Sequence, residues 1–263
     1  MPQTTIATWN INSVRLREGL VCDLLSEADP DVICLQECKS PVEKIPRERF
    51  AALGYPHLIA RGFKGYNGVA ILSKRPIVEV GARHMTGRED ARHIAARLEN
   101  GLVVHNFYVP AGGDEPDRAI NPKFGHKLDF LAEMRDWFAG ERPEDAVLVG
   151  DLNIAPREDD VWSHRQLLKV VSHTPVEVDA LEAVRAAGDW VDVTRRHQPD
   201  GKLYSWWSYR AADWEAADKG RRLDHIWATP NVAGRSTGSR VLKHVRGWPQ
   251  PSDHAPVVAT FDH

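Results

Sequence analysis

The chain has 263 residues, and its 34 lysines and arginines against 37 aspartates and glutamates give a formal net charge of −3. With 42% hydrophobic and 27% charged residues, its composition is that of an ordinary soluble globular protein. No apolar run approaches the roughly 20 residues of a membrane-spanning helix, and the N-terminus lacks the layout of a signal peptide, so we expect a cytoplasmic protein without a membrane segment.

Short apolar runs, each bounded by turn residues, alternate with amphipathic stretches along the chain. They predict strands over Thr5–Trp9, Val32–Leu35, Gly68–Leu72, His93–Leu98, Leu102–Tyr108, Ala146–Val149, Leu223–Ala228 and Ala255–Phe261. No Ser- and Gly-rich linker and no repeat interrupts this pattern, so residues 1–263 are expected to form one domain.

Apolar residues at helical spacing predict three helices. They are Arg15–Ala28 with Asn12 or Ser13 as N-cap, a helix that begins at Pro122 after the cap residue Asn121, and Pro175–Ala187, which closes on Gly188. Strands mixed with helices throughout predict an α/β or α+β sandwich.

Polar residues cluster at five places at the ends of the predicted strands. They are Asn10 and Asn12, Glu37, Tyr108, Asp151 and Asn153, and Asp253 with His254. Alternation along an extended chain would place Asn10 and Asn12 on one side, and likewise Asp151 and Asn153. Each residue alone has an ordinary structural explanation, since an Asp-x-Asn after a strand is more often a turn that bonds its own backbone. Five such strand ends together favour a catalytic site.

These residue types match the needs of phosphodiester hydrolysis. Mg²⁺ on the Glu37 carboxylate would offset the charge of the phosphate. Asp151, steadied by Asn153, could deprotonate the attacking water, and Asp224 could hold the tautomer of His254. Three residues would donate hydrogen bonds to the phosphate oxygens: His254, Asn10 and Tyr108.

Eight short segments occur in the order typical of one known family. They are Trp-Asn-Ile-Asn (9–12), Ile-Cys-Leu-Gln-Glu (33–37), Asn-Gly-Val-Ala-Ile (67–71), Tyr-Val-Pro (108–110), Asn-Pro-Lys-Phe (121–124), Gly-Asp-Leu-Asn (150–153), Arg-Leu-Asp (222–224) and Ser-Asp-His-Ala-Pro (252–256). With them the chain resembles, over nearly its whole length, the exonuclease III family of abasic-site endonucleases within the endonuclease/exonuclease/phosphatase superfamily.

The resemblance implies a four-layer sandwich of two packed β-sheets flanked by helices, with the active site at one edge between the sheets. It also implies Mg²⁺- or Mn²⁺-dependent hydrolysis 5′ to abasic sites in double-stranded DNA, together with 3′→5′ exonuclease activity and cleaning of 3′ ends. The family leans towards monomers.

The resemblance also implies roles for single residues. Glu37 matches the metal ligand, with Asn12 beside it and Asp253 near a second proposed metal position. The remaining matches are Asp151 as the residue that activates water, Asn10 and Asn153 as orienting groups, Tyr108 as a phosphate contact, and Asp224 with His254 as the paired acid and histidine. The identity of the general base and the number of metals stay open.

Three positions depart from the family pattern. Relatives commonly carry Gln or Asn at the position of Ala111, and the alanine removes the phosphate contact that such a side chain would make. Trp206 and Leu223 fit the family's pocket for a displaced sugar, but Arg221 stands where an apolar wall residue is more usual. Ser13 replaces a common glycine, a change that a helix cap tolerates.

Charge is distributed unevenly along the chain. Residues 133–160 hold nine acids and three bases, whereas residues 221–250 hold six bases and one acid. Such runs are usually solvated faces; alternatively, the basic stretch, beginning with Arg221 and Arg222, contacts the phosphates of the DNA backbone.

Two other functions fit parts of the pattern. One is a phosphodiesterase of the same fold that acts on RNA or on a lipid or inositol phosphate. The other is a catalytically inactive regulator that binds nucleic acid, although such a protein would be expected to have lost Glu37, the Asp-x-Asn at 151–153 or the Ser-Asp-His at 252–254, all of which are present.

Overall fold

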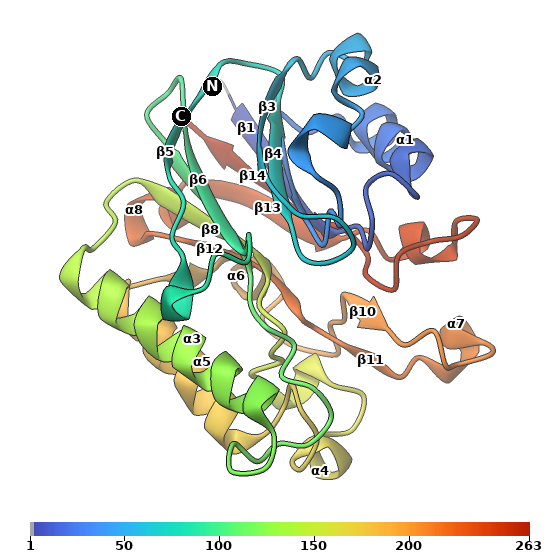
Figure 1. Cartoon of the computed structure of the whole chain (residues 1–263), viewed down its shortest axis with the longest axis vertical. Helices are drawn as coiled ribbons and strands as arrows, with labels where there is room; N and C mark the ends of the chain where they lie inside the picture. Colours follow the sequence, from blue (N-terminus) through green and yellow to red (C-terminus); the bar gives the residue numbers. More distant parts are fainter. Residues whose placement is uncertain (1–2) are drawn as a thin grey trace.

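Two six-stranded sheets pack face to face in the computed structural model, which describes residues 3–263 (Figure 1). The first sheet has the order β13-β14-β1-β2-β4-β3 and comprises β1 (Gln3–Asn10), β2 (Val32–Gln36), β3 (His57–Arg61), β4 (Val69–Ser73), β13 (Ser236–Val241) and β14 (Val257–Asp262). The second has the order β5-β6-β7-β8-β12-β9 and comprises β5 (Ile77–Gly81), β6 (His93–Leu98), β7 (Val103–Tyr108), β8 (Ala146–Asp151), β9 (Val191–Asp192) and β12 (Asp224–Ala228).

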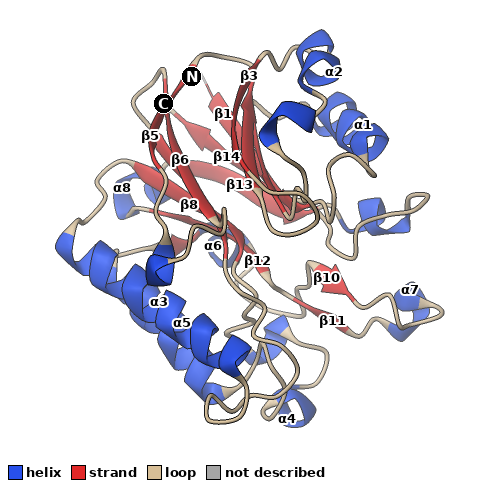
Figure 2. Ribbon diagram, viewed as in Figure 1, coloured by secondary structure: helices blue, strands red, loops and turns tan. Residues whose placement is uncertain are grey.

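Helices cover the outer face of each sheet, which completes the four layers that the family resemblance implied (Figure 2). The first sheet is covered by α1 (Glu18–Ala28) and α2 (Arg47–Ala52), and the second by α3 (Pro122–Gly140) and α5 (Pro175–Ala187). The short helices are α4 (His164–Leu167), α6 (Val193–His197), α7 (Trp214–Ala217) and α8 (Pro230–Gly234). A small ribbon of β10 (Trp206–Trp207) and β11 (Gly220–Arg221) extends with α7 beyond the sheets (Figure 1). No helix among residues 3–263 is both long enough and apolar enough to cross a membrane.

The central strands are buried on both faces because a sheet lies on one side and helices on the other. Ile6 of β1 and Val104 of β7 belong to the core between the sheets, whereas Trp9 of β1 packs in the cluster that contains α1. Such strands are continuous apolar runs in the sequence. All eight predicted strands are therefore present, with ends shifted by only a few residues.

The strands that the sequence did not predict include the outermost strand on each side of both sheets. These four are β13, β3, β5 and β9, and their residues are largely half-buried or exposed. An edge strand can carry polar residues on its open side, so it lacks the apolar run by which the central strands were recognised. The two-residue strands β10 and β11 are too short to give a periodic signal.

The first predicted helix begins later than expected. It starts at Glu18 rather than Arg15, and Arg17 precedes it without a side-chain cap. Neither Asn12 nor Ser13 is the N-cap, because both have left-handed backbones (φ 48° and 87°), and the Ser13 amide donates to the Glu37 carbonyl at 2.8 Å. This segment therefore turns towards β2 before the helix begins.

The other two helices begin where the sequence predicted. The Asn121 side chain accepts a hydrogen bond from the Lys123 amide at 3.0 Å, and Pro122 occupies the first turn of α3. Helix α5 spans Pro175–Ala187 and ends at Gly188 as expected.

Arg222 is buried in an ion-pair cluster, which corrects the expectation that it contacts DNA. Its Nε and NH2 donate to the two oxygens of Asp160 at 2.8 and 2.9 Å, and its NH1 lies 2.8 Å from Asp192. Arg195 also pairs with Asp160. Burial by itself would raise the pKa of Asp160, but Arg222 and Arg195 lower it to about 2. A guanidinium with no exposed surface cannot reach a phosphate in solvent.

We predict that Asp160→Asn lowers the free energy of unfolding by about 3–5 kcal/mol, because it removes the carboxylate that two buried guanidinium groups share and leaves only Asp192 beside Arg222. Urea denaturation followed by circular dichroism measures this change. Asp159→Asn is the matched control, since Asp159 lies next in sequence, is 44% exposed and makes only a 3.9 Å contact with Lys202; we expect it to cost less than about 1 kcal/mol. Equal losses in the two variants would contradict the importance of the cluster.

Candidate active site

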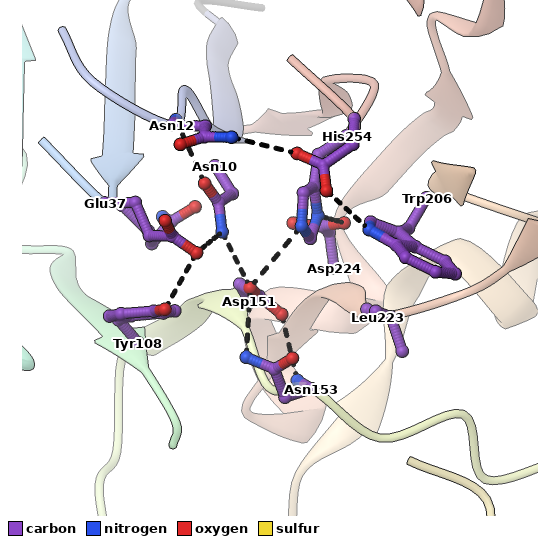
Figure 3. Close-up of polar contacts among 12 residues, drawn as sticks. Asn10, Asn12, Glu37, Tyr108, Asp151, Asn153, Trp206, Leu223, Asp224 and His254 are labelled. Carbon is purple, nitrogen blue, oxygen red and sulfur yellow. Dashed lines mark hydrogen bonds and ion pairs between the residues drawn. The ribbon is translucent and has the colours of Figure 1, made fainter. Parts of the chain in front are cut away.

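The polar residues predicted from the strand ends gather at one edge of the sandwich (Figure 3). β1 runs parallel to β2 and β7 runs parallel to β8, so the carboxyl ends of each pair coincide. The edge borders a cavity of about 930 Å³, whose lining includes Glu37, Asp151, Asn153, Trp206, Leu223, Asp253 and His254. The sheets thus bring together residues that are as much as 244 positions apart, the separation of Asn10 and His254 in the sequence.

Asp151 is the last residue of β8, and its side chain accepts hydrogen bonds from the turn that follows. Its Oδ1 accepts from the Asn153 amide at 2.9 Å, and its Oδ2 accepts from the Asn153 side chain at 3.1 Å. Asn153 has a left-handed backbone (φ 55°), so the extended alternation expected here is wrong. The same correction holds after β1, where the Asn12 amide donates to Asn10 Oδ1 at 3.1 Å. Both turns nevertheless keep their side chains at the site.

The Asp151 carboxylate is buried and faces other charges. Burial raises the pKa of Asp151 to about 7, while His254 opposes this shift and Asp224 adds to it. Asn10 Nδ2 donates to Asp151 Oδ2 at 2.8 Å, which favours the ionised form. A carboxyl group that titrates near neutrality is suited to accepting a proton.

Glu37, which follows β2, is held by three donors. Tyr108 OH and Asn10 Nδ2 donate to its Oε1 at 2.7 and 3.0 Å, and Lys39 Nζ lies 2.7 Å from its Oε2. Burial would raise the pKa of Glu37, but Lys39 and the three hydrogen bonds lower it overall. Glu37 is therefore ionised at neutral pH.

His254 and Asp224 form a buried pair opposite Asp151. His254 Nδ1 donates to Asp224 Oδ2 at 2.8 Å, and His254 Nε2 lies 3.8 Å from Asp151 Oδ2. Burial would lower the pKa of His254, but Asp224 and then Asp151 raise it to about 10. The histidine is thus an imidazolium that presents Nε2–H to the cavity.

Two residues at this edge were not found from the sequence. Ser205 donates to Asp224 Oδ2 at 2.6 Å and accepts from the amides of Leu223 and Asp224, both at 3.0 Å. Lys39 pairs with Glu37, as described above. Neither residue belongs to a motif that carries chemistry by itself, and only the folded contacts reveal them.

The remaining predicted residues lie on the other side of the cavity. Asp253 accepts from Asn12 Nδ2 at 3.3 Å and from Trp206 Nε1 at 2.9 Å. Leu223 is buried in the wall, and Arg221 also lines the cavity, with its guanidinium carbon 5.2 Å from the centre of the Trp206 ring. Ala111 contributes only its carbonyl, which accepts from the buried Lys127 at 3.2 Å.

The donor set fits a divalent metal ion. Lys39 Nζ lies 2.7 Å from Glu37 Oε2 and donates to Asn12 Oδ1 at 2.6 Å, so these two oxygens converge on one cation already. One oxygen or nitrogen from each of Asp151, Asp224 and His254 also lies within 4.8 Å of the others, but His254 as an imidazolium has no free nitrogen for a metal ion. Carboxylate and amide oxygens are the ligands that hard cations such as Mg²⁺ prefer.

The edge of this α/β sandwich thus holds a histidine–aspartate pair, a second buried carboxyl group and an ionised glutamate, which are the kinds of group that hydrolysis of a phosphate ester requires. The model of the Endonuclease/Exonuclease/phosphatase family matches residues 7–254. The chain belongs to this family, in which it groups with the hydrolytic nucleases called exodeoxyribonuclease III and AP endonuclease.

Relatives from distant organisms match along nearly the whole chain. Exodeoxyribonuclease III of Haemophilus influenzae is 32% identical over 268 residues, covering 97% of this chain and 98% of that protein. An AP endonuclease from Archaeoglobus fulgidus superposes with a TM-score of 0.92 at 33% identity, covering 99% of this chain and 100% of that one. A 3′ phosphatase from Neisseria bound to a product DNA hairpin superposes with a TM-score of 0.90 at 32% identity, covering 99% of this chain and 100% of that one.

We predict that kcat/KM falls as the pH drops through about 7, because a raised pKa means that Asp151 takes up its proton already at neutral pH and then cannot act as a base. A second fall is expected as the pH rises through about 10, where His254 loses its proton. Measurement of kcat/KM at saturating metal from pH 5 to pH 11 tests both limbs. A profile that stays flat below pH 7 would contradict the assignment of Asp151.

Proposed function

We propose that this nuclease hydrolyses the phosphodiester bond 5′ to abasic sites in double-stranded DNA and also removes nucleotides and blocking groups from 3′ ends. The convergence of Glu37, Asp151 and His254 on one cavity, beside the wall formed by Trp206 and Leu223, carries this proposal. The names of the similar structures, an AP endonuclease and a 3′ phosphatase with a DNA product, support DNA as the substrate. We further propose that it acts as a monomeric single domain in the cytoplasm.

Glu37 and Asn12 would hold the divalent metal, Mg²⁺ or Mn²⁺, with Asp253 nearby. When bound, this cation supplies positive charge that offsets the negative charge on the phosphate. Asn12 is oriented for this task because its side chain lies between Lys39 and Asp253.

Asp151 accepts the proton of the attacking water, and Asn10 and Asn153 fix the direction of its carboxylate through their hydrogen bonds. The water oxygen bonds to phosphorus, and the bond from phosphorus to the 3′ oxygen of the upstream nucleotide breaks. That oxygen is the leaving group and takes up a proton from solvent, and the phosphate stays on the downstream residue as its 5′ phosphate. His254 Nε2–H donates to a phosphate oxygen as negative charge develops there, and Tyr108 adds a contact on the opposite side.

Trp206 and Leu223 contact the DNA residue on the 3′ side of the scissile phosphate. An indole ring provides an apolar face on which a sugar that has lost its base can pack. Trp206 is only half-buried, and its Nε1 bond to Asp253 fixes its plane beside the catalytic residues.

We predict that Asp151→Asn lowers kcat about 10²–10⁴-fold, because the amide cannot accept the proton of water. The assay is incision of an end-labelled duplex with one abasic analogue, beside an undamaged duplex with a recessed 3′ end, each with Mg²⁺ and with EDTA. DNA binding and the thermal midpoint should change little. Near wild-type turnover by this variant would refute the proposed role, and no metal-dependent cleavage of either duplex by the wild type would refute the proposed function.

We predict that Glu37→Gln raises the Mg²⁺ concentration needed for half-maximal incision by about tenfold or more, since it removes the charge of the metal ligand. Isothermal titration with Mn²⁺ provides a second readout that does not depend on turnover. Glu43→Gln is the control, because Glu43 lies in a short turn away from the cavity. An unchanged metal requirement would exclude Glu37 as a ligand.

A further inference from the structure

Arg221 and the catalytic histidine lie on either side of Trp206 in three neighbouring extended segments, which we call the three-stranded strip. Arg221 of β11 pairs with Trp206 of β10, and Trp206 forms a β-bridge with His254. Neighbouring strands are about 4.8 Å apart, so the backbones of Arg221 and His254 are about 10 Å apart across the strip. Arg221, Asp151 and His254 line one cavity.

The Arg221 guanidinium makes no ion pair with any acid among residues 3–263. Its NH1 donates to the Val171 carbonyl at 2.9 Å and to Ser172 Oγ at 2.7 Å, both of them uncharged acceptors. Glu177 is the acid that affects its pKa, but that carboxylate is engaged by buried Lys127 at 2.5 Å. Arg221 Nε is buried and has no hydrogen-bond partner in this part of the chain.

The segment that anchors Arg221 is held in a costly backbone conformation. Ser172 has a φ of 87°, which favours glycine, and its amide donates to both Glu177 oxygens at 3.0 and 2.9 Å. Strain of this kind persists only where surrounding contacts impose it, and it is common at ligand sites. The Lys127–Glu177 pair therefore keeps Ser172 in place to fix the guanidinium.

A half-buried guanidinium without a counter-ion is unfavourable, because it has lost part of its hydration and gained no opposite charge. The lining of the same cavity also includes two bases, Lys219 and Arg210, and five acids: Glu37, Asp114, Asp151, Asp213 and Asp253. Within the described part of the chain, none of these acids forms an ion pair with Arg221, whose guanidinium instead donates to uncharged acceptors. An oxyanion entering the cavity would supply the missing partner, and a guanidinium binds such groups through paired donors.

We propose that Arg221 binds a second oxyanion of the substrate, carried by the group on the 3′ side of the scissile phosphate, and thereby selects substrates that have one. This inference rests on the proposed function, which places that group beside Trp206. The oxyanion is the next phosphate of the strand at an internal abasic site, or an acidic remnant of a damaged sugar at a 3′ end.

Two pairs of duplexes separate these sources. One duplex of the first pair ends in a 3′-phosphoglycolate, which has a free carboxylate. The other ends in the 3′-phosphoglycolamide, in which an uncharged amide replaces that carboxylate. The second pair contains an internal abasic analogue followed by a normal phosphate or by a neutral methylphosphonate. For each pair, kcat/KM of the charged substrate is divided by that of the neutral one, for the wild type, Arg221→Leu and Arg221→Lys. Arg75→Leu is the control, because Arg75 is exposed and remote from this cavity.

We expect the wild type and Arg75→Leu to favour the charged member of at least one pair about tenfold or more. Arg221→Leu should bring that ratio close to one, and Arg221→Lys should retain part of it. Unchanged thermal midpoints show that the variants fold. A wild-type ratio near one in both pairs, or a ratio that Arg221→Leu does not change, overturns the inference.

If the proposed function is wrong, the wild type cleaves none of the four duplexes, which is a different result. The inference is then tested by comparing the equilibrium affinities of the wild type for the two duplexes of the first pair, measured in EDTA. Preference of the wild type for the carboxylate, lost in Arg221→Leu, supports it, and equal binding of the two duplexes overturns it.

Discussion

Two buried amides fix the position of one sheet on the other, and the site depends on that position. Gln36 Nε2 of β2 donates to Asn106 Oδ1 of β7 at 2.7 Å, and Asn106 Nδ2 donates to the carbonyls of Leu35 and Ala70. A shift between the sheets would leave these groups without partners in the core, which is costly. Glu37 follows Gln36 directly and Tyr108 lies two residues after Asn106, so the same pair sets the 2.7 Å contact between Glu37 and Tyr108.

Charge is arranged in the site so that two carboxyl groups behave differently. Glu37 faces Lys39 and two further hydrogen-bond donors, Asn10 and Tyr108, so its pKa is lowered and it stays ionised. Asp151 is more deeply buried and lies near Asp224 and Glu37, so its pKa is raised to about 7. Different surroundings thus suit one acid to holding a cation and the other to exchanging a proton. Asn10 donates to both and links the two sheets at this point.

The departures from the family pattern surround the catalytic residues without altering them. Ala111 adds no polar side chain beside the cavity, and Arg221 brings a charge to the part of the wall that holds Trp206 and Leu223. Ser13 has a left-handed backbone that glycine would adopt with less strain. These changes bear on which substrate group fits the cavity, while the 2.8 Å hydrogen bond between His254 and Asp224 and the bonds of Asn10 and Asn153 to Asp151 are all in place.

The sequence by itself determined the central strands, the strand-end residues and the family, because strands buried on both faces need apolar runs and because motifs for phosphate chemistry occupy strand ends. It did not determine the edge strands, whose open sides accept polar residues. Nor did it separate Arg222, buried against Asp160, from its neighbour Arg221, which faces the cavity; alternation along the chain says only that they point apart. Tertiary structure decided this choice and the roles of Lys39 and Ser205, because a charged or polar side chain takes its role from partners that lie far away in the sequence.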